Sequence, residues 1–226
     1  MRFSHLIGIC LDAVTLSKAC DELCASIRLR KVLGVILKIG NRLNSAGVES
    51  EKTSANGFAV ESLAKLNEVK TNRKTTLMYY VASVVQDWND SLLSVKDELP
   101  NVLKAHSITA FDLSLKSLEE ELNDMKKTVP SLFNSRDIDD KVDAINVFIH
   151  DASVSVFKLR QLSDLFYTKF DDVRRYLVLG NGVKPTTLFS ILSCFCNDLA
   201  TIDLQLHLPK RDEKKFCGGR TICRPY

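Results

Sequence analysis

Glycine and proline are scarce in this sequence. Its 226 residues include nine glycines and five prolines, whereas 45% of the residues are hydrophobic. Both scarce residue types interrupt helices, so their low number beside this hydrophobic content predicts a folded, mostly helical protein. A chain of this length can bury a substantial core, either as one domain or as two small ones.

A large excess of charge of one sign is also missing. The formal net charge is +3, and residues 209–226 contain six basic and two acidic residues. The residues before them therefore include 25 basic and 26 acidic side chains. Nucleic-acid-binding domains gather positive charge on the folded body, so we expect no nucleic-acid partner. We expect residues 1–208 to form the domain and residues 209–226 to form a basic, disordered tail.

The sequence has no stretch of 18 consecutive apolar residues, so we expect no membrane span. The apolar residues 6–11 faintly resemble the core of a signal peptide. Asp12 interrupts them, however, and the helical pattern continues without a clear cleavage site. We therefore expect no signal peptide at this position.

The seven cysteines are an odd number and lack the short paired spacing of zinc ribbons. Cys10, Cys20 and Cys24 lie within an apolar helical pattern, where a thiol usually acts as a small buried hydrophobe. A zinc site joining Cys20 and Cys24 to Cys217 and Cys223 can be drawn, but its spacing argues against it. We expect reduced thiols in the cytoplasm and no bound metal.

Residues suited to catalysis do not gather in a recognised pattern. The sequence has no Gly-x-Ser-x-Gly motif and no glycine-rich phosphate loop. The histidines His5, His106, His150 and His207 are scattered. Acidic runs such as residues 119–121 are explained most simply as solvated helix faces or helix caps. The sequence therefore predicts that the protein is not an enzyme and needs no cofactor.

Two long heptad patterns are present in the second half of the chain. The first consists of Ile108, Phe111, Leu115, Leu118, Leu122, Met125, Val129 and Leu132, and the second of Val142, Ile145, Ile149, Ala152, Val156, Leu159, Ser163, Phe166, Phe170, Val173 and Leu177. Two such helices, joined by the polar residues 134–140, are expected to pack as an antiparallel hairpin roughly 35–50 Å long. Pro130 predicts a kink or an end near Thr128. We expect an all-α fold, an elongated helical bundle with a long antiparallel coiled-coil-like hairpin.

Shorter helical patterns precede and follow the hairpin. Apolar spacing predicts helices over residues 3–30, 31–43 and 58–66, a helix from Thr75 or Thr76 to about Trp88, and a last helix from Thr186 or Thr187. The helix over residues 31–43 is apolar over most of its circumference, so we expect it to be buried on several sides. Threonine suits the start of a helix because its hydroxyl accepts a hydrogen bond from a free amide.

The helix over residues 31–43 leads into an unusual series of breaks. Residues 33–44 read LGVILKIGNRLN, and residues 56–81 read NGFAVESLAKLNEVKTNRKTTLMYYV. Gly40 allows another backbone to approach closely, and Asn41 and Asn44 suit the free backbone groups of an unwinding helix. A plain helix terminus explains the same residues, and both explanations can hold together.

These two blocks resemble the formin homology-2 domain, a family that assembles actin filaments. The stretches ACDEL (residues 19–23) and LFSILSCF (residues 188–195) are similar to further patterns of the family, so the resemblance covers about residues 10–203. Domains of this family are entirely helical and run from a lasso through a linker, a knob and a coiled-coil region to a post. This chain resembles the post and coiled-coil half, so we expect the activity of residues 1–226 to be impaired by the absence of lasso, linker and knob.

The resemblance implies a surface for a second chain. Gly40, Asn41 and Asn44 match the post motif, which in the family helps to form the dimer surface that receives the lasso. The implied partner at this surface is another formin homology-2 chain, provided that it supplies a lasso.

The resemblance also implies an actin-binding site. Lys70 matches a lysine implicated in binding actin, and the looser matches Arg73 and Lys74 are basic neighbours suited to an acidic surface. The implied function is actin filament nucleation and barbed-end elongation in the cytoplasm and cytoskeleton. Without the resemblance, Lys70 is explained as a solvated lysine, and the alternative function is a helical scaffold that dimerises through residues 108–177 and has no actin activity.

Overall fold

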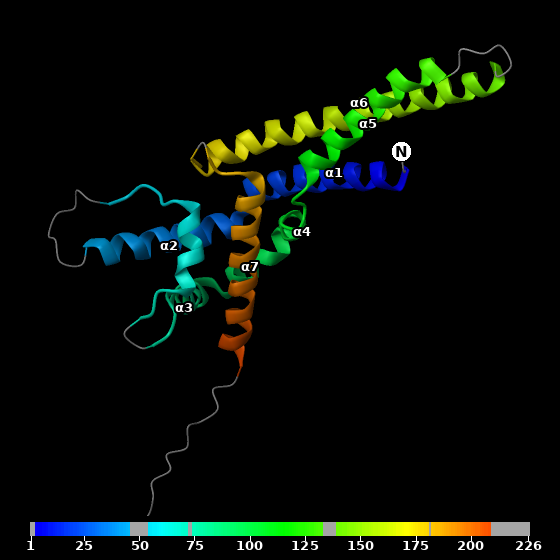
Figure 1. Cartoon of the computed structure of the whole chain (residues 1–226). Coiled ribbons are helices and arrows are strands. Elements are labelled where there is room, and N and C mark those ends of the chain that lie inside the picture. Colours follow the sequence, from blue (N-terminus) through cyan, green and yellow to red (C-terminus); the bar gives the residue numbers. More distant parts are fainter. Residues whose placement is uncertain (1–2, 46–53, 72–73, 133–138, 181, 209–226) are drawn as a thin grey trace, which may run out of the picture.

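Helices make up most of the described part of the chain (Figure 1). The computed structural model describes residues 3–45, 54–71, 74–132, 139–180 and 182–208, so the expected tail at 209–226 lies outside the described residues. The elements are α1 (Phe3–Ala25), α2 (Ile27–Ser45), η2 (Val60–Asn67), α3 (Leu77–Asn89), η3 (Asp90–Glu98), α4 (Pro100–Ala105), α5 (Phe111–Leu132), α6 (Asp139–Tyr176) and α7 (Pro185–His207), with η denoting 3₁₀ helix. The predicted all-α class is confirmed.

Helices α5 and α6 form the predicted antiparallel hairpin. The Tyr167 hydroxyl donates a hydrogen bond to Asp112 at 2.6 Å, and the Arg160 guanidinium lies 3.2 Å from Glu119. Residue numbers therefore rise along one helix while they fall along the other. The buried heptad positions are Phe111, Leu115, Leu118, Leu122, Ala152, Val156, Leu159, Ser163, Phe166, Phe170 and Val173. The heptad patterns thus identified the packed faces of both helices.

One boundary of the hairpin differs from the prediction. Helix α5 continues past Thr128 and Pro130 and ends at Leu132. Pro130 has no amide to donate to the carbonyl of Lys126, but only two residues of the helix follow it. The predicted end near Thr128 was therefore wrong, and the alternative, a kink there, stays a prediction.

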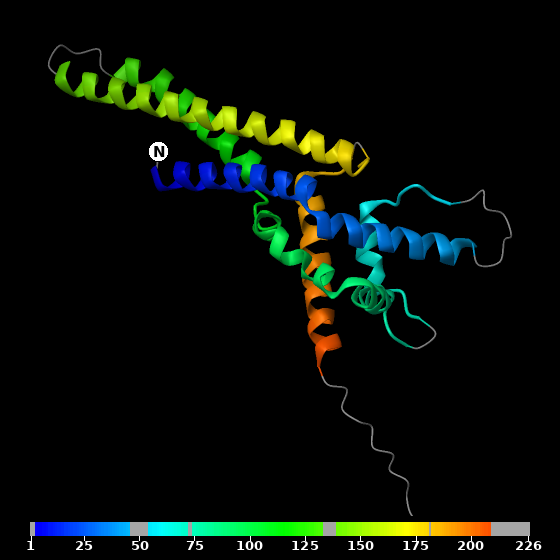
Figure 2. The ribbon, with the colours of Figure 1, turned by 180° about the vertical axis from the view of Figure 1, so that it is seen from behind.

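Helix α1 lies beside α6 and adds a third helix to the hairpin region (Figures 1 and 2). Lys169 of α6 forms an ion pair with Asp21 near the end of α1. Near the start of α1, Leu6 packs against a small core that includes Ala152 and Val156 of α6. The two helices therefore run parallel, and the free end of the hairpin extends beyond the start of α1.

A one-residue break at Ser26 separates α1 from α2, where the sequence predicted one helix over residues 3–30. The Ser26 hydroxyl accepts a hydrogen bond from the Leu29 amide at 3.1 Å and donates one to Glu98 at 2.6 Å. Glu98 also accepts from the Arg28 amide at 3.1 Å. Burial raises the pKa of Glu98, but these hydrogen bonds and the charge of Arg28 outweigh it and lower the pKa below its usual value. A distant carboxylate thus caps α2, and local sequence patterns do not show such a cap.

Helix α7 passes through the main core. Its buried side chains are Leu188, Phe189, Leu192, Ser193, Phe195, Cys196, Leu199 and Ile202. It begins at Pro185, ahead of the predicted Thr186 or Thr187, because proline at the first position gives up only an amide that has no helical partner. By length and composition α7 is apolar enough to cross a membrane, but one helix of this kind is weak support for a span, since core helices pass the same test.

Aromatic rings connect the hairpin to α7. The ring centroids of Phe111 and Phe166 are 6.2 Å apart, those of Phe166 and Phe170 are 6.2 Å apart, and those of Phe170 and Phe189 are 6.5 Å apart. All but Phe111 are at most 1% exposed. These contacts join the hairpin to the rest of the structure through one continuous core.

Candidate functional site

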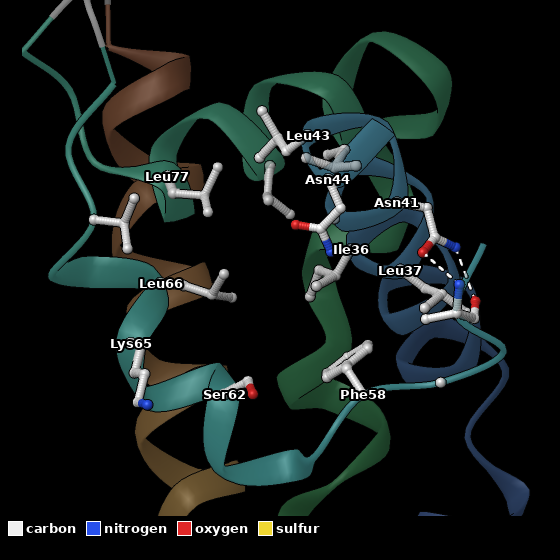
Figure 3. Close-up of a pocket in the computed structure, with 16 residues that line it drawn as sticks. Ile36, Leu37, Asn41, Leu43, Asn44, Phe58, Ser62, Lys65, Leu66 and Leu77 are labelled. Carbon is white, nitrogen blue, oxygen red and sulfur yellow. Dashed lines mark hydrogen bonds between the residues drawn. The ribbon is translucent and has the colours of Figure 1, made fainter. Parts of the chain in front are cut away.

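The last turns of α2 hold an extended segment of the chain against the helix. The Asn41 side-chain amide donates to the Ala55 carbonyl at 2.9 Å, and its oxygen accepts from the Ala55 amide at 2.9 Å. The same amide nitrogen donates to the Ser54 hydroxyl at 3.1 Å. Asn41 therefore satisfies both backbone groups of a residue that has no strand partner, as Figure 3 shows.

An apolar groove lies between this end of α2, the extended segment and η2 (Figure 3). Its cavity volume is about 280 Å³. The lining side chains are mostly apolar: Ile36, Leu37, Ile39, Leu43, Phe58, Leu66, Val69, Leu77 and Val81, with Gly40, Asn41, Asn44, Ala55, Gly57, Ser62 and Lys65 completing it. We call this hollow the α2–η2 groove. It is the kind of concave, apolar surface that binds side chains of a partner.

The α2–η2 groove brings together the three residues predicted for the post surface. Gly40, Asn41 and Asn44 all line it, although nothing in the structure tests their role in binding. A Cβ atom added at Gly40 would meet no described atom within 4 Å, so the space beside this glycine is open. Close approach within the described part of the chain therefore does not explain Gly40.

A second hollow of about 760 Å³ lies on the other side of Phe58. Leu37, Gly57 and Phe58 line both hollows. Arg30 and Tyr176 line the second hollow, and Arg30 Nε donates to the Tyr176 hydroxyl at 2.9 Å. The extended segment around Phe58 thus separates two neighbouring apolar depressions along α2.

A short hairpin turn presents the predicted basic residues. Lys70 and Thr76 form an antiparallel bridge, and the Thr71 amide donates to the Thr75 carbonyl at 2.8 Å. Lys70 and Lys74 are exposed, and Lys74 has a φ of 63°, a left-handed conformation that glycine or asparagine usually adopts. Arg73 lies outside the described residues. We call residues 70–76 the basic turn.

The basic turn connects directly to the α2–η2 groove. The Leu77 amide donates to the Val69 carbonyl at 2.8 Å, and the side chains of both residues line the groove. Thr76 caps α3 by accepting a hydrogen bond from the Tyr79 amide at 3.2 Å, as the sequence predicted. Sequence reasoning missed Ala55, because its contribution is a backbone pairing that no side-chain pattern reports.

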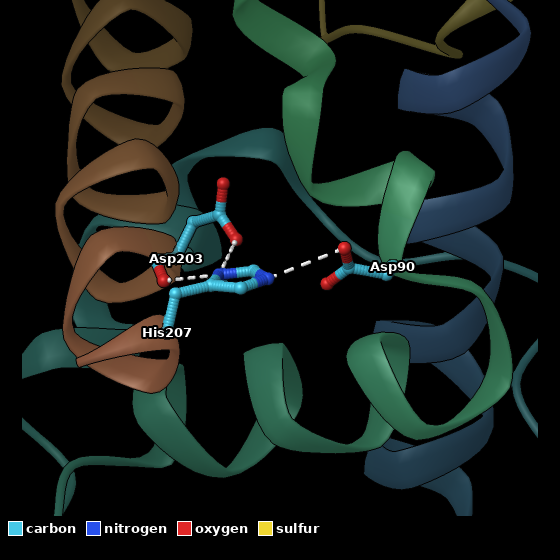
Figure 4. Close-up of side chains that lie close together, drawn as sticks. All are labelled: Asp90, Asp203 and His207. Carbon is cyan, nitrogen blue, oxygen red and sulfur yellow. Dashed lines mark hydrogen bonds and ion pairs between the residues drawn. The ribbon is translucent and has the colours of Figure 1, made fainter. Parts of the chain in front are cut away.

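A separate cluster of Asp90, Asp203 and His207 joins η3 to the end of α7 (Figure 4). His207 Nε2 lies 3.3 Å from Asp90, and Nδ1 lies 3.1 Å from the Asp203 carboxylate and 2.9 Å from the Asp203 carbonyl. The Asp203 carbonyl and the Asp90 charge raise the pKa of His207. Both ring nitrogens face oxygens, which is the arrangement of a protonated histidine between two acids, so the geometry gives no reason to assign a metal there.

Four of the described cysteines, Cys10, Cys20, Cys24 and Cys196, are not activated for chemistry. Burial raises the pKa of the Cys20 and Cys196 thiols to about 12. Burial also raises the pKa of Cys10 and Cys24, which are half-buried. A raised pKa leaves little thiolate, the form that reacts or binds metals. Cys20 is the small buried hydrophobe that the sequence predicted, while Cys217 and Cys223 lie outside the described residues.

The family model of the Formin Homology 2 Domain matches residues 11–200. The chain belongs to the formin homology-2 family. The match contains the complete α2–η2 groove and the basic turn. The resemblance of residues 33–44 and 56–81 to this family is therefore confirmed.

Curated relatives agree with this formin homology-2 assignment. The chain is 29% identical over 189 residues to Protein diaphanous homolog 3 of Rattus norvegicus, which covers 81% of this chain and 16% of that protein. It is 28% identical over 195 residues to Disheveled-associated activator of morphogenesis 2 of Gallus gallus (80% and 17%) and 30% identical over 171 residues to Formin-like protein 5 of Oryza sativa subsp. japonica (72% and 10%). The chain thus spans less than a fifth of the length of these relatives.

Proposed function

We propose that this chain is an actin-binding cytoskeletal protein of formin type. The observation that carries the proposal is the family match over residues 11–200, which includes an exposed basic turn beside an apolar groove. The action would be binding without covalent chemistry. A place in the cytoplasm and cytoskeleton belongs to the same proposal.

In this proposal the basic turn contacts actin. Lys70 and Lys74 are exposed, and the salt bridges found among the described residues include neither of them. The backbone of Lys70 pairs with the backbone of Thr76. Cations held in this way can meet carboxylates of a partner without first breaking internal ion pairs. Arg73 is assigned to the same site from the sequence alone.

The α2–η2 groove receives a segment of a second formin homology-2 chain in this proposal. Its lining is apolar, and the open space beside Gly40 leaves room for a partner backbone. Asn41 is already used within the chain, so its part is to hold the extended segment that forms one wall. Asn44, which lines the same groove, contacts the partner in this proposal.

Residues 1–226 alone are expected to bind actin weakly and to nucleate filaments poorly. Linking two binding units raises their combined affinity by about 10²–10⁴ when the geometry permits both to bind. We identify no lasso, linker or knob in the described residues, so the linked arrangement needs a partner chain. A scaffold that dimerises through residues 108–177 is less well supported, because the buried heptad side chains of α5 and α6 already pack within the chain.

Co-sedimentation with actin filaments tests the proposal. Wild-type protein should pellet with filaments, and Lys70→Ala/Lys74→Ala should pellet less at the same actin concentration. Lys126→Ala/Lys127→Ala on α5 is a matched control, since both lysines are exposed and distant from the turn in sequence. Absence of pelleting at any actin concentration would reject actin binding. Strong nucleation by these residues in a fluorescent assembly assay would reject the expected impairment.

A further inference from the structure

An asparagine–glycine pair, Asn56 and Gly57, lies in the extended segment between α2 and η2. Both residues are exposed, and neither belongs to a helix. The backbone nitrogen of the glycine and the side-chain amide carbon of the asparagine belong to neighbouring residues, so they can react without a bimolecular encounter. Glycine has no Cβ atom to obstruct the approach of its nitrogen. The pair therefore supplies both a nucleophile and an electrophile.

Neither reacting group of the pair is held by the fold. No hydrogen bond found among the described residues uses the Asn56 side chain or the Gly57 amide. The neighbouring Ala55 differs, since Asn41 binds both of its backbone groups. A nitrogen whose N–H donates within the structure would have to break that hydrogen bond before it could attack. The Gly57 nitrogen breaks no contact within the described part of the chain.

Asparagines elsewhere in the described residues lack this combination. Asn123, Asn146 and Asn197 lie inside α5, α6 and α7, where the amide of the following residue donates within the helix. The Asn67 side chain donates to Asp198 at 2.6 Å. Among the asparagines that the structure describes, Asn56 alone precedes a glycine. Sequence and local structure therefore both favour reaction at this position.

The reaction of this pair needs only water. The Gly57 nitrogen forms a bond to the side-chain carbonyl carbon of Asn56, and the bond from that carbon to the side-chain nitrogen breaks. Ammonia leaves with the proton that the Gly57 amide gives up, and a succinimide ring remains. Water then opens the ring. Cleavage at the side-chain carbon gives aspartate, whereas cleavage at the backbone carbonyl gives isoaspartate, in which the main chain passes through the side-chain carbon.

The pair lies between two positions that shape both hollows. Asn41 holds Ala55, the residue before the pair, and Phe58, the residue after it, lines the α2–η2 groove and the second hollow. Asn56 itself lines the second hollow. Isoaspartate adds a carbon atom to the main chain at this point and a negative charge to the lining. Ala55 or Phe58 then has to shift from its position.

We propose that Asn56 is a site of spontaneous deamidation, and that isoaspartate at this position displaces the extended segment that separates the two hollows. The inference does not rest on the proposed function, because neither the conversion nor the displacement needs a partner. It concerns how long the wall of the α2–η2 groove keeps its shape, whichever partner the groove receives.

Peptide mapping by mass spectrometry after incubation of the full chain tests the conversion. Asn56 should be converted before any other described asparagine, and faster at about pH 8.5 than at about pH 6, because the attacking nitrogen has to lose its proton. Gly57→Ala should slow the conversion by about tenfold, since its Cβ atom obstructs the attack. That Cβ atom would meet no described atom beyond its chain neighbours within 4 Å, so the variant should fold. Gly182→Ala changes the other asparagine–glycine pair of the sequence and should leave the rate at Asn56 unchanged.

Either of two results would overturn the conversion. In the first, a synthetic peptide of residues 54–60 is converted while Asn56 of the folded chain is not, because the fold then holds the two reacting groups apart. In the second, Gly57→Ala is converted at the wild-type rate. Asn56→Gln, whose longer side chain does not form this ring readily, should resist conversion and replaces Gly57→Ala if that variant unfolds.

Hydrogen exchange tests the displacement. Labelling with protein isoaspartyl methyltransferase identifies the isoaspartate form, and in that form the Ala55 amide should lose its protection. Asn56→Asp adds the charge without lengthening the main chain, so it should keep the Ala55 amide protected. Equal protection of Ala55 in the isoaspartate form and in the unreacted chain would show that the segment stays in place, and would refute the displacement.

Discussion

The side chain of Asn41 forms two hydrogen bonds with the backbone of Ala55, the same pattern that joins paired residues of neighbouring β-strands. Its side-chain amide donates to the Ala55 carbonyl and accepts from the Ala55 amide, with both distances at 2.9 Å. An asparagine can make both bonds at once because its side chain carries the same donor and acceptor as a peptide group. This contact holds the extended segment in the position that forms one wall of the α2–η2 groove.

Replacing Asn41 should release that segment while leaving the helices intact. Asn41→Ala removes both hydrogen bonds and should lower the free energy of unfolding by about 1 kcal/mol. The clearest measurement is hydrogen exchange of the Ala55 amide, which should lose its protection. Asn44→Ala is the control, because Asn44 lines the same groove without a hydrogen bond to Ala55. Unchanged exchange in Asn41→Ala would show that the segment is held by other contacts.

Lys74 should be exchangeable for glycine without loss of stability but with loss of actin binding. A φ of 63° destabilises the folded state by about 1–2 kcal/mol when the residue has a Cβ atom, and glycine avoids this destabilisation. Glycine also gains more freedom in the unfolded chain, which offsets part of the benefit. Thermal unfolding should show an unchanged or slightly raised midpoint for Lys74→Gly, and co-sedimentation should show weaker binding. Wild-type pelleting by this variant would remove Lys74 from the site.

His207 should stabilise the end of α7 in a pH-dependent way. The pKa of His207 is raised in the folded state. Its contribution to folding stability is therefore complete below the unfolded-state pKa of about 6.5 and is lost as the pH rises through the folded-state pKa. His207→Gln should therefore lower the thermal midpoint at pH 5.5 and have little effect at pH 8.5. His150→Gln, an exposed substitution on α6, serves as control. An equal loss at both pH values would contradict a protonated contact with Asp90 and Asp203.

Phe170 should be the most sensitive position at the junction of the hairpin and α7. Its ring contacts Phe166 and Phe189, and it is 1% exposed. Phe170→Ala should lower the free energy of unfolding by about 3–5 kcal/mol, because the surrounding helices cannot fully close the cavity. Denaturant unfolding measures this loss. Phe157→Ala, at an α6 position 63% exposed, should change stability by much less.

Regular patterns in the sequence predicted the helices but not how they meet. The heptad spacing identified the faces of α5 and α6, and the threonine before Leu77 identified the start of α3. The break at Ser26 was missed because Glu98, 72 residues away, caps the following helix. The end of α5 was placed too early because a proline close to a helix end destabilises the helix less than a proline in its middle.

The candidate site was predictable where family motifs mark it. Gly40, Asn41 and Asn44 were chosen from the sequence, and the structure places all three on one groove. The intramolecular role of Asn41 was not predictable, because its partner is the backbone of Ala55, 14 residues further along the chain.

The break at Ser26 also has a mechanical consequence. Helix α1 belongs to the hairpin and α2 to the groove, so the direction of the hairpin relative to the groove depends partly on one residue and its contact with Glu98. With a rise of about 1.5 Å per residue, the 38 residues of α6 extend about 57 Å, so a tilt of about 5° would displace the far end by about 5 Å. A small change of angle at Ser26 would therefore move the far end of the hairpin by several times the displacement near the break.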